Sequence, residues 1–569
     1  MKKIYFREIK QISKNNTFII LIINLCILLL FSLFKLISYE EIDDFMIEDI
    51  LAGYSSNYNS PYTIYINYLL SYIIMIFFKL LPNINWYIIS ILFFQLVAFT
   101  IIGKNILYFF TKKRGICIYI GLCLLFYIPL LYNVSYTSTS GLLIVSCLTE
   151  QLYIILIQKK IKLFCILCII FSLINGVMLR SNIFLLYCIF LSIIFIYLLI
   201  NKIKIKKLLF LNIMMTILIS IIYLFNSYIY KSNETYNKFI EYNKYRSILQ
   251  DFIHLNYTED KDILENVGLN YNDIDLFNSF CNSDEIVFST QNLRELCKQK
   301  IEKDSIFSLF DFNIFEILKY LLFSWFSTYI FAIIIIFFII FSNIKNNKFS
   351  NFLILFTIII LHILFIAINK SVYRVNVVLY IFGIITLIII NSNQINLKLN
   401  KPKQYNIILF IIFLIFLTTF ITLDFYYRKF NVKLAAVNAY SELFEYTNTN
   451  KDNVYISITQ ALQYEYLFMN SFKNDNKYLL SNVKRLGSWD DRDDRYFDFK
   501  YKYNIDSLYS SLIEKDNCYI IIHKFNEKLK SLNNTITFLN DHYTNKTIMY
   551  KEIKNINNEL YIYKLYTSY

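Results

Sequence analysis

Apolar runs of about 20 residues recur along this chain, and they constrain its fold more than any other feature. The first covers residues 17–37, and ten more follow at 86–110, 116–133, 137–156, 161–179, 182–200, 208–230, 318–341, 350–369, 372–390 and 405–424. A helix of this length spans the hydrocarbon core of a bilayer with its backbone hydrogen bonds satisfied. Because 57% of all residues are hydrophobic, the sequence predicts an α-helical multi-pass membrane protein with eleven transmembrane helices.

One more apolar run, residues 62–81, does not fit a simple alternation of crossings. If it crossed the bilayer, Lys112-Lys113-Arg114 would face outward and every later loop would invert. Basic residues flank membrane spans mainly on the cytoplasmic side. We therefore expect 62–81 to lie in the outer leaflet as a juxtamembrane helix, within an outer segment that covers 38–85.

The distribution of charge predicts the orientation. Lysines and arginines gather in six short segments, accompanied by a single acid, Glu8; the segments are the N-terminus, 104–114, 159–162, 202–207, 345–348 and 398–403. These segments are expected in the cytoplasm. The long loop 231–313 has more acidic than basic residues and is expected outside. The chain then divides into a transmembrane domain, 1–429, and an extracytoplasmic domain, 430–569.

Other signals exclude some classes of function. The net charge of +14 lies mostly in short loops between apolar runs, which argues against a nucleic-acid partner. The four histidines are scattered and show no zinc-binding spacing. Cys281 and Cys297 share a polar loop, so the sequence leaves a disulfide between them open. Glu150, inside an apolar run, is expected to pair within the helix bundle.

An acidic pair, Asp43-Asp44, follows the first apolar run directly. Insertion into a membrane does not require carboxylates at this position, so they are available for proton abstraction or for binding a divalent cation such as Mg²⁺ or Mn²⁺. Two adjacent carboxylates also raise the pKa of one of them. The structural alternative is that they favour the N-terminus of a helix that starts near Phe45.

Three cations lie at the ends of apolar runs on the predicted outer side: Arg180, Lys370 and Arg374. We expect them to bind a phosphate group near the membrane surface. The structural alternative is that each side chain simply extends from the bilayer into water.

The polar segments outside the membrane have secondary-structure signals of their own. Residues 241–255 have helical periodicity, and Gly268 begins a turn into a second helix with Asn272 or Asp273 as its N-cap. In the tail, 453–458, 518–522 and 560–563 resemble strands and 459–469 resembles a helix, which predicts a small α/β domain. Between the first two strands, Trp489 follows a glycine turn; it is expected either to stack on a sugar or to anchor the structure.

Several of these elements together resemble the GT-C superfamily, membrane glycosyltransferases that use polyprenyl-phosphate-linked sugars. They are the first span, Asp43-Asp44, Pro61-Tyr62 before the juxtamembrane run, Asn85-Trp86-Tyr87 and Lys112-Lys113-Arg114. The resemblance covers mainly the first 200 residues. Many members carry His-Pro-Pro where this chain has Ser60-Pro61-Tyr62, and this departure leaves the acceptor-binding residues open.

The chain also resembles uncharacterised multi-pass proteins of low-GC Gram-positive bacteria. The shared pattern has an acidic pair, a Tyr-Thr-rich corner as at 136–139, an Arg-x4-Asp as at 246–251, a Gly-x3-Asn-Asp as at 268–273 and a Gly-Trp turn as at 487–489. The two resemblances imply a GT-C-like fold in a bacterial plasma membrane, with the N-terminus in the cytoplasm.

They also imply an inverting glycosyltransferase that moves a sugar from a polyprenyl-phosphate donor to an envelope polysaccharide, glycolipid or protein. Asp43 or Asp44 would serve as base or metal ligand, and Arg180, Lys370 and Arg374 would bind the donor phosphate. The acceptor or its sugar would contact Tyr62, Arg246, Asp273 and Trp489. Two alternatives remain: a flippase or transporter of lipid-linked sugars, and a non-catalytic envelope scaffold that binds glycan. The small number of glycines and prolines, and the absence of a duplicated half, disfavour the transporter.

Overall fold

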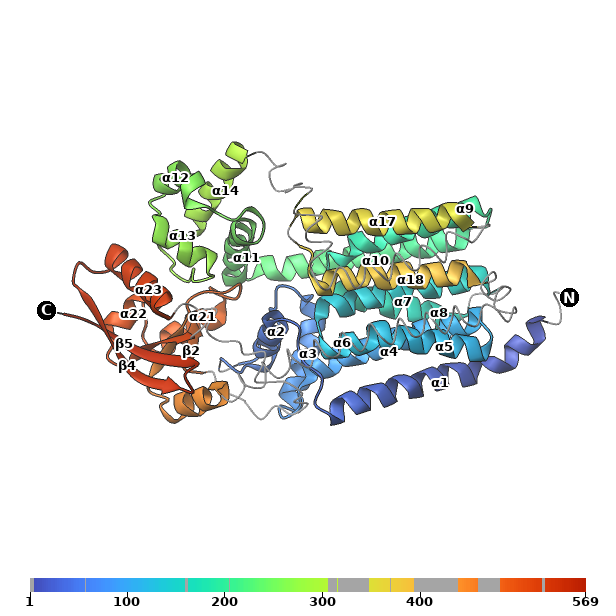
Figure 1. Cartoon of the computed structure of the whole chain (residues 1–569), viewed down its shortest axis with the longest axis horizontal. Coiled ribbons are helices and arrows are strands. Elements are labelled where there is room, and N and C mark those ends of the chain that lie inside the picture. The colour runs from blue at the N-terminus through green and yellow to red at the C-terminus, as the bar shows by residue number, and fades with distance from the viewer. Residues whose placement is uncertain are drawn as a thin grey trace.

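The computed structural model of the chain describes residues 5–56, 58–158, 162–203, 205–304, 315, 347–368, 370–392, 439–458, 481–523 and 528–568. The predicted spans 318–341 and 405–424, the basic segment 398–403 and the predicted helix 459–469 lie outside these residues. The described part has a bundle of long helices at one end and a mixed α/β region at the other, with the two chain ends far apart (Figure 1).

Seven helices in the described residues are long and apolar enough to cross a membrane. They are α4 (Trp86–Phe109), the continuous run α5 (Lys112–Leu122), η1 (Cys123–Tyr127) and α6 (Ile128–Tyr132), α7 (Tyr136–Leu156), α9 (Ile183–Ile200), α10 (Lys206–Ser232), α17 (Lys348–Ala367) and α18 (Tyr373–Ile390). Two more predicted spans form α1 (Tyr5–Leu33) and α8 (Leu163–Leu179), whose apolar parts are shorter. The chain is thus a mostly helical, multi-pass membrane protein, as predicted.

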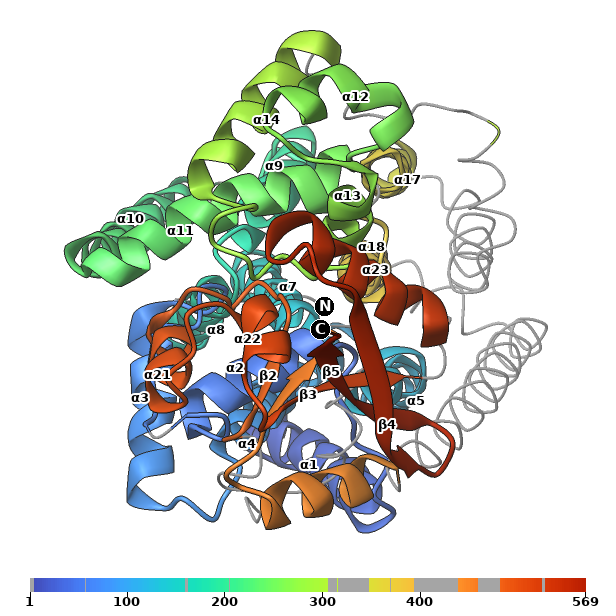
Figure 2. The same ribbon diagram turned by 90° about the vertical axis from the view of Figure 1, so that its left-hand side faces the viewer.

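The run predicted to remain outside the bundle forms α3 (Tyr68–Leu80). Its 13 residues rise about 20 Å, less than the hydrocarbon thickness of about 30 Å. The helix lies across the end of the bundle, roughly perpendicular to the long bundle helices (Figures 1 and 2). The run therefore forms a short helix across the bundle end, and its position in the outer leaflet stays a prediction.

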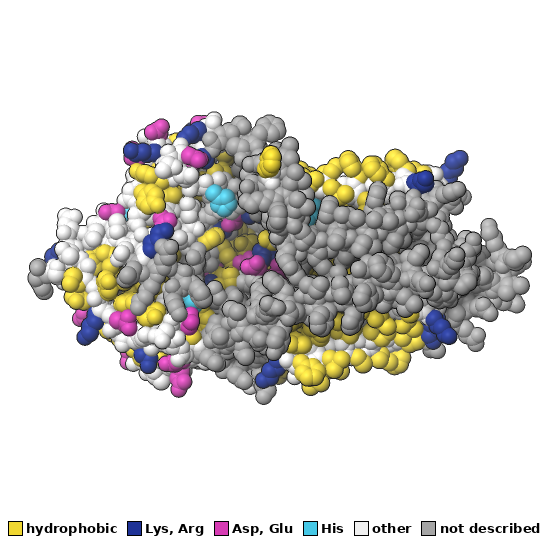
Figure 3. All heavy atoms as spheres, viewed as in Figure 1, with side chains coloured by type: hydrophobic (Ala, Val, Ile, Leu, Met, Phe, Trp, Pro, Cys, Tyr) yellow, Lys and Arg dark blue, Asp and Glu magenta, His cyan; other side chains and the backbone are white. Residues whose placement is uncertain are grey.

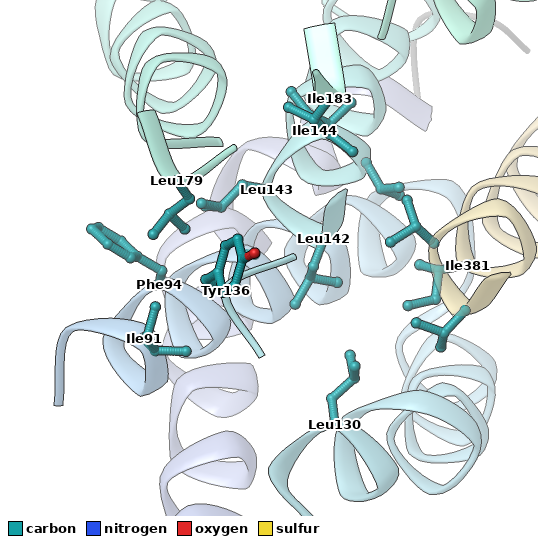
Figure 4. Close-up of a cluster of buried hydrophobic side chains, with 14 of the residues drawn as sticks. Ile91, Phe94, Leu130, Tyr136, Leu142, Leu143, Ile144, Leu179, Ile183 and Ile381 are labelled. Carbon is teal, nitrogen blue, oxygen red and sulfur yellow. The ribbon is translucent and has the colours of Figure 1, made fainter. Parts of the chain in front are cut away.

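Helix α7 occupies the centre of the bundle and is buried along nearly its whole length. Leu142, Leu143 and Ile144 of α7 pack among side chains of α4, α9 and α18 (Figure 4). Small residues permit close approach of membrane helices. Gly141 is an example, because a Cβ atom at this position would lie 2.2 Å from Val378 Cγ2 of α18.

A charged pair lies inside this bundle. Lys104 Nζ of α4 lies 2.6 Å from Glu150 Oε2 of α7, and both side chains are buried. The predicted pairing of Glu150 within the bundle is therefore confirmed. Lys104 lies within the predicted span 86–110, in the last third of α4, which continues to Phe109.

The described part of the long loop 231–313 is mostly helical. It contains α11 (Glu234–Ser247), a π-helical turn η2 (Ile248–Ile253), α12 (Tyr257–Asn266), α13 (Tyr271–Asn278) and α14 (Thr290–Asp304). The predicted helix 241–255 thus corresponds to α11 and η2. The predicted N-cap of α13 is wrong, because Asn270 caps this helix and Asp273 completes a capping box from position N3.

The C-terminal region contains one mixed sheet of five strands in the order β2-β1-β3-β5-β4. The strands are β1 (Val454–Ser457), β2 (Val483–Arg485), β3 (Cys518–His523), β4 (Ile548–Ile556) and β5 (Leu560–Thr567). β1 pairs in parallel with β2 and β3, whereas β5 pairs antiparallel with β3 and β4. Helices α21 (Asp494–Lys502), α22 (Leu508–Glu514) and α23 (Lys528–His542) complete the predicted α/β region.

The two faces of this sheet belong to different cores, because successive strand residues point to opposite sides. Tyr455 and Ile521 extend the core of the bundle, whereas Ile456 and Ile520 pack with α12, α13 and α14 of the long loop. Where described side chains of the bundle are visible, along its upper and lower margins, they are mostly hydrophobic, and lysines and arginines lie at the far end (Figure 3). The sheet therefore joins the long loop to the bundle end.

Candidate functional site

A short helix, α2 (Ile42–Ala52), carries the acidic pair into the junction between bundle and sheet (Figure 1). Asp43 and Asp44 lie in its first turn, where the helix dipole favours negative charge. The helix ends at Gly53, whose φ of 73° is left-handed. Neither aspartate caps the helix, because Glu41 occupies the N-cap position and no side chain hydrogen-bonds there.

The two carboxylates point to different surroundings, as expected for neighbouring residues on a helix. Asp43 is half-buried; its Oδ1 accepts a hydrogen bond of 3.1 Å from Trp489 Nε1, and its Oδ2 lies 3.9 Å from Arg374 Nη2. Asp43 therefore faces an indole N–H of the C-terminal region on one side and a cation of α18 on the other.

Asp44 is buried against the bundle. Its Oδ1 accepts hydrogen bonds from the Tyr87 hydroxyl at 2.7 Å and from the Tyr136 amide at 2.9 Å. Its Oδ2 is buried and has no hydrogen-bond partner among the described residues. Burial raises the pKa of Asp44 to about 7, although the bonds from Tyr87 and Tyr136 act in the opposite direction. Asp44 thus links α2 to α4 and α7.

The three predicted phosphate ligands meet at this end of the bundle. Arg180 Nη1 donates to Tyr136 Oη at 3.0 Å and to Thr137 Oγ1 at 2.7 Å. Arg374 Nη1 lies 3.0 Å from Glu41 Oε1. Lys370 lies with its ammonium 4.4 Å from the centre of the Phe252 ring.

The environment of Lys370 shows that these cations act on one another. Burial lowers the pKa of Lys370, and the charges of Arg374, Arg180 and Arg246 lower it further, whereas Asp251 raises it. A free anion near these side chains would relieve the repulsion between them. We call Arg180, Arg246, Lys370 and Arg374 the cation cluster.

Arg246 belongs to the same region through α11 and η2. Its guanidinium is buried, donates to Asn243 Oδ1 and Gln250 Oε1 at 2.8 Å each, and lies 3.8 Å from Asp251 Oδ2. The π-helical turn η2 places Asp251 and Phe252 beside Lys370. Such turns are frequent at functional sites.

Two predicted residues lie elsewhere. The Tyr62 ring stacks on Tyr236 with 3.9 Å between ring centres, within an aromatic cluster at the junction of α3, α10 and α11. Asp273 stands at position N3 of α13, and its Oδ1 lies 2.9 Å from His542 Nε2, so it joins the long loop to α23. Neither side chain lies beside Asp43. Trp489, in contrast, reaches Asp43 from the C-terminal region.

Sequence reasoning missed several members of the site. Glu40 Oε1 accepts the Arg374 amide at 3.2 Å, and burial raises the pKa of Glu40 to about 8, although Arg374 lowers it. Tyr65 packs edge-on against Trp489, and burial together with Asp43 raises its pKa. Glu40 was visible in the same acidic run as Asp43, whereas nothing in the sequence marks Tyr65.

The described residues do not contain a group of three or more His, Cys, Asp or Glu side chains placed to hold a metal ion. Asp43 and Asp44 diverge, and both oxygens of Asp43 face donors. The two carboxylates thus have different hydrogen-bond partners, and a divalent cation bound by this pair stays a prediction. Cys281 and Cys297 also remain apart: their thiols lie near the carbonyls of Ser279 and Tyr245, and they form no disulfide with each other.

Comparisons of the sequence with models of protein families and with curated proteins give no match.

Proposed function

We propose that this protein is a membrane glycosyltransferase that moves a sugar from a polyprenyl-phosphate donor to a hydroxyl group of a cell-envelope acceptor, on the outer face of the membrane. One observation carries the proposal: a half-buried carboxylate, Asp43, lies 3.9 Å from Arg374, a member of the cation cluster, at the end of the membrane helices. The resemblance of the N-terminal third to GT-C enzymes supports it.

The arrangement suits a single displacement. Asp43 takes the proton of the acceptor hydroxyl, and the oxygen of that hydroxyl attacks the anomeric carbon of the donor sugar. The bond from the anomeric carbon to the phosphate oxygen breaks, and the electron pair leaves with polyprenyl phosphate. The cation cluster stabilises the charge that develops on this phosphate. A single displacement inverts the configuration at the anomeric carbon.

Asp43 and Asp44 have different roles in this proposal. Asp43 is half-buried and faces the cation cluster, so it is the candidate base. Asp44 accepts hydrogen bonds from Tyr87 and the Tyr136 amide on one oxygen, so it holds α2 against the bundle. The site lies at the junction between the helix bundle and the sheet. This position suits the donor, because its lipid stays in the bilayer while its phosphate reaches the membrane surface.

A transfer assay tests the proposal. The purified protein in detergent is mixed with labelled polyprenyl-phosphate hexoses and pentoses and with a crude envelope acceptor, and labelled acceptor is measured. Transfer with inverted configuration is the expected result. Vesicles that contain only this protein provide the second arm: movement of the labelled lipid across the bilayer without transfer would replace the proposal with a flippase, and glycan binding without either activity would replace it with a scaffold.

A further inference from the structure

The segment 483–495 of the C-terminal region lies along α2, and it reaches the candidate base. Trp489 donates its indole N–H to Asp43 Oδ1 at 3.1 Å. One turn further along α2, Met46 Sδ lies 3.1 Å from Arg485 Nη1 and 3.6 Å from Ser488 Oγ. Residues that are 446 positions apart in the chain are thus in direct contact.

A buried arginine fixes this segment to α2. The side chain of Arg495 is 2% exposed and lies within 3.3 Å of three carboxylates: Asp49 of α2, Asp490 and Asp493. Asp49 is held in turn by the amide and hydroxyl of Ser55 at 2.8 and 2.6 Å. Because two of these carboxylates follow Trp489 closely in the sequence and the third belongs to α2, the ion pairs set the distance between Trp489 and the helix.

The long loop holds the other side of the same segment. The Leu486 carbonyl accepts the Ser283 amide at 2.8 Å, and a Cβ atom on Gly487 would lie 2.0 Å from the Phe280 carbonyl oxygen. Arg492 stacks on Tyr242 with 3.7 Å to the ring centre. The turn that carries Trp489 is therefore fixed on two sides before it meets Asp43.

The contacts of the indole argue against a stacking platform for sugar. Trp489 is 7% exposed, and Tyr65 packs against it with ring centres 4.8 Å apart. Its polar atom is directed at a carboxylate that has its other oxygen near Arg374. Two donors on the two oxygens fix the orientation of a carboxylate, and such preorganisation is what a general base requires.

We propose that Trp489 is a positioning residue: its N–H orients Asp43 toward the acceptor, and the Arg495 ion pairs hold Trp489 in place. This inference rests on the proposed transfer reaction. The C-terminal region then contributes to the rate of the chemical step itself, through a single hydrogen bond.

Trp489→Phe removes the N–H and keeps an aromatic ring, and Trp86→Phe is the matched control, because the Trp86 N–H donates only to the Leu81 carbonyl at an exposed corner. We expect Trp489→Phe to lower kcat about 10- to 100-fold with an unchanged KM for the donor, since a bond to a charged group is worth about 1.5–3 kcal/mol. The acidic limb of the kcat/KM profile should move to higher pH, because loss of a hydrogen-bond donor disfavours a charged carboxylate. Trp86→Phe should leave all three quantities unchanged.

Two additional experiments test the role of Trp489 even if Trp489→Phe folds poorly or if no sugar transfer is detected. Replacing Trp489 with 3-benzothienylalanine exchanges N–H for sulfur in a ring of nearly the same volume, so it preserves the packing if Phe does not. Labelling of Asp43 by a water-soluble carbodiimide, quantified by mass spectrometry at fixed pH, reports the carboxylate directly. We expect labelling to rise several-fold in Trp489→Phe, in the isostere and in Arg495→Met, and not in Trp86→Phe.

The outcomes separate the two proposals. If labelling of Asp43 increases in the variants and the wild-type protein transfers no sugar, the positioning of Asp43 is supported and the proposed function is overturned. Normal transfer, with labelling, kcat and pH profile unchanged in both the Phe and the benzothienylalanine proteins, would overturn the positioning role and leave the proposed function intact.

Discussion

Arg374 Nη2 lies 3.9 Å from Asp43 Oδ2, and this pair joins the start of α18 to the first turn of α2. The arginine is also bound to Glu41 and, through its amide, to Glu40. One cation thus contacts three carboxyl groups of the segment after the first membrane helix. This relationship is the basis of the proposed reaction, because it places a candidate base and a candidate phosphate ligand side by side.

Removal of single cations should weaken use of the donor. We expect Arg180→Gln, Lys370→Met and Arg374→Gln each to lower kcat/KM for the polyprenyl-phosphate sugar about 10- to 100-fold, since each loses a charge-assisted contact. Lys238→Gln is the control, because Lys238 is exposed and pairs only with Glu234 of its own helix. Steady-state kinetics with varied donor measure the effect. Unchanged kinetics in all three variants would exclude this cluster as the phosphate site.

The stability of the protein should fall as the pH rises from about 4 to 7. Burial raises the pKa of Asp44 from 3.8 to about 7, so the folded state binds more protons than the unfolded state throughout this window. Asp44→Asn removes this contribution, and its Tm in detergent should decline less with pH than that of the wild type. Glu48, with a pKa raised to about 7 by burial, keeps part of the slope. Equal slopes for wild type and Asp44→Asn would contradict the burial of an ionisable Asp44.

The charged pair inside the bundle should show strong coupling. Lys104→Met leaves Glu150 buried without its partner, and Glu150→Gln leaves Lys104 in the same state. Each single change should destabilise the protein by about 3–5 kcal/mol, whereas the double variant should recover most of the loss. Thermal unfolding in detergent of the four proteins gives the coupling. Additive effects in the double variant would show that the two charges do not depend on each other.

Gly487 should tolerate no side chain. In Gly487→Ala the new Cβ would lie 2.0 Å from the Phe280 carbonyl oxygen and 2.4 Å from the Asn282 amide nitrogen, so the long loop must shift. We expect a loss of about 1–3 kcal/mol and a local increase in hydrogen exchange over 280–283. Gly268→Ala is the comparison for backbone strain without a clash, because the φ of Gly268 is 76° and nothing lies within 4 Å of an added Cβ atom. Unchanged hydrogen exchange over 280–283 in Gly487→Ala would contradict the close contact between Gly487 and the long loop.

Much of the fold follows from local patterns. Apolar runs predicted the membrane helices that the structure describes, and alternation predicted β1 and β3 within one residue and the first half of β5. β2 has three residues and β4 is largely exposed, so neither shows a clear apolar alternation. The N-cap of α13 was misplaced because Asn270, Asn272 and Asp273 are all acceptable caps, and only the backbone geometry decides between them.

The site was predictable only in part, for a physical reason. Charged residues at the ends of apolar runs are conspicuous, so the sequence suggested Asp43, Arg180, Lys370 and Arg374 as candidates. The predicted topology placed all four on the same side of the membrane. The contact of Trp489 with Asp43 depends on the docking of the sheet on α2. No local pattern encodes a contact of that kind, and the same holds for Tyr65.

The most direct measurement of the central claim is sugar transfer by Asp43→Asn. Asn keeps the size and the contact with Trp489 but cannot take a proton, so the account predicts a loss of at least about 100-fold in kcat with a folded protein of wild-type Tm. Asp498→Asn, which changes an exposed carboxylate of α21, should transfer sugar normally. If Asp43→Asn transferred sugar at the wild-type rate, Asp43 would not be the base and the account of this site would be wrong.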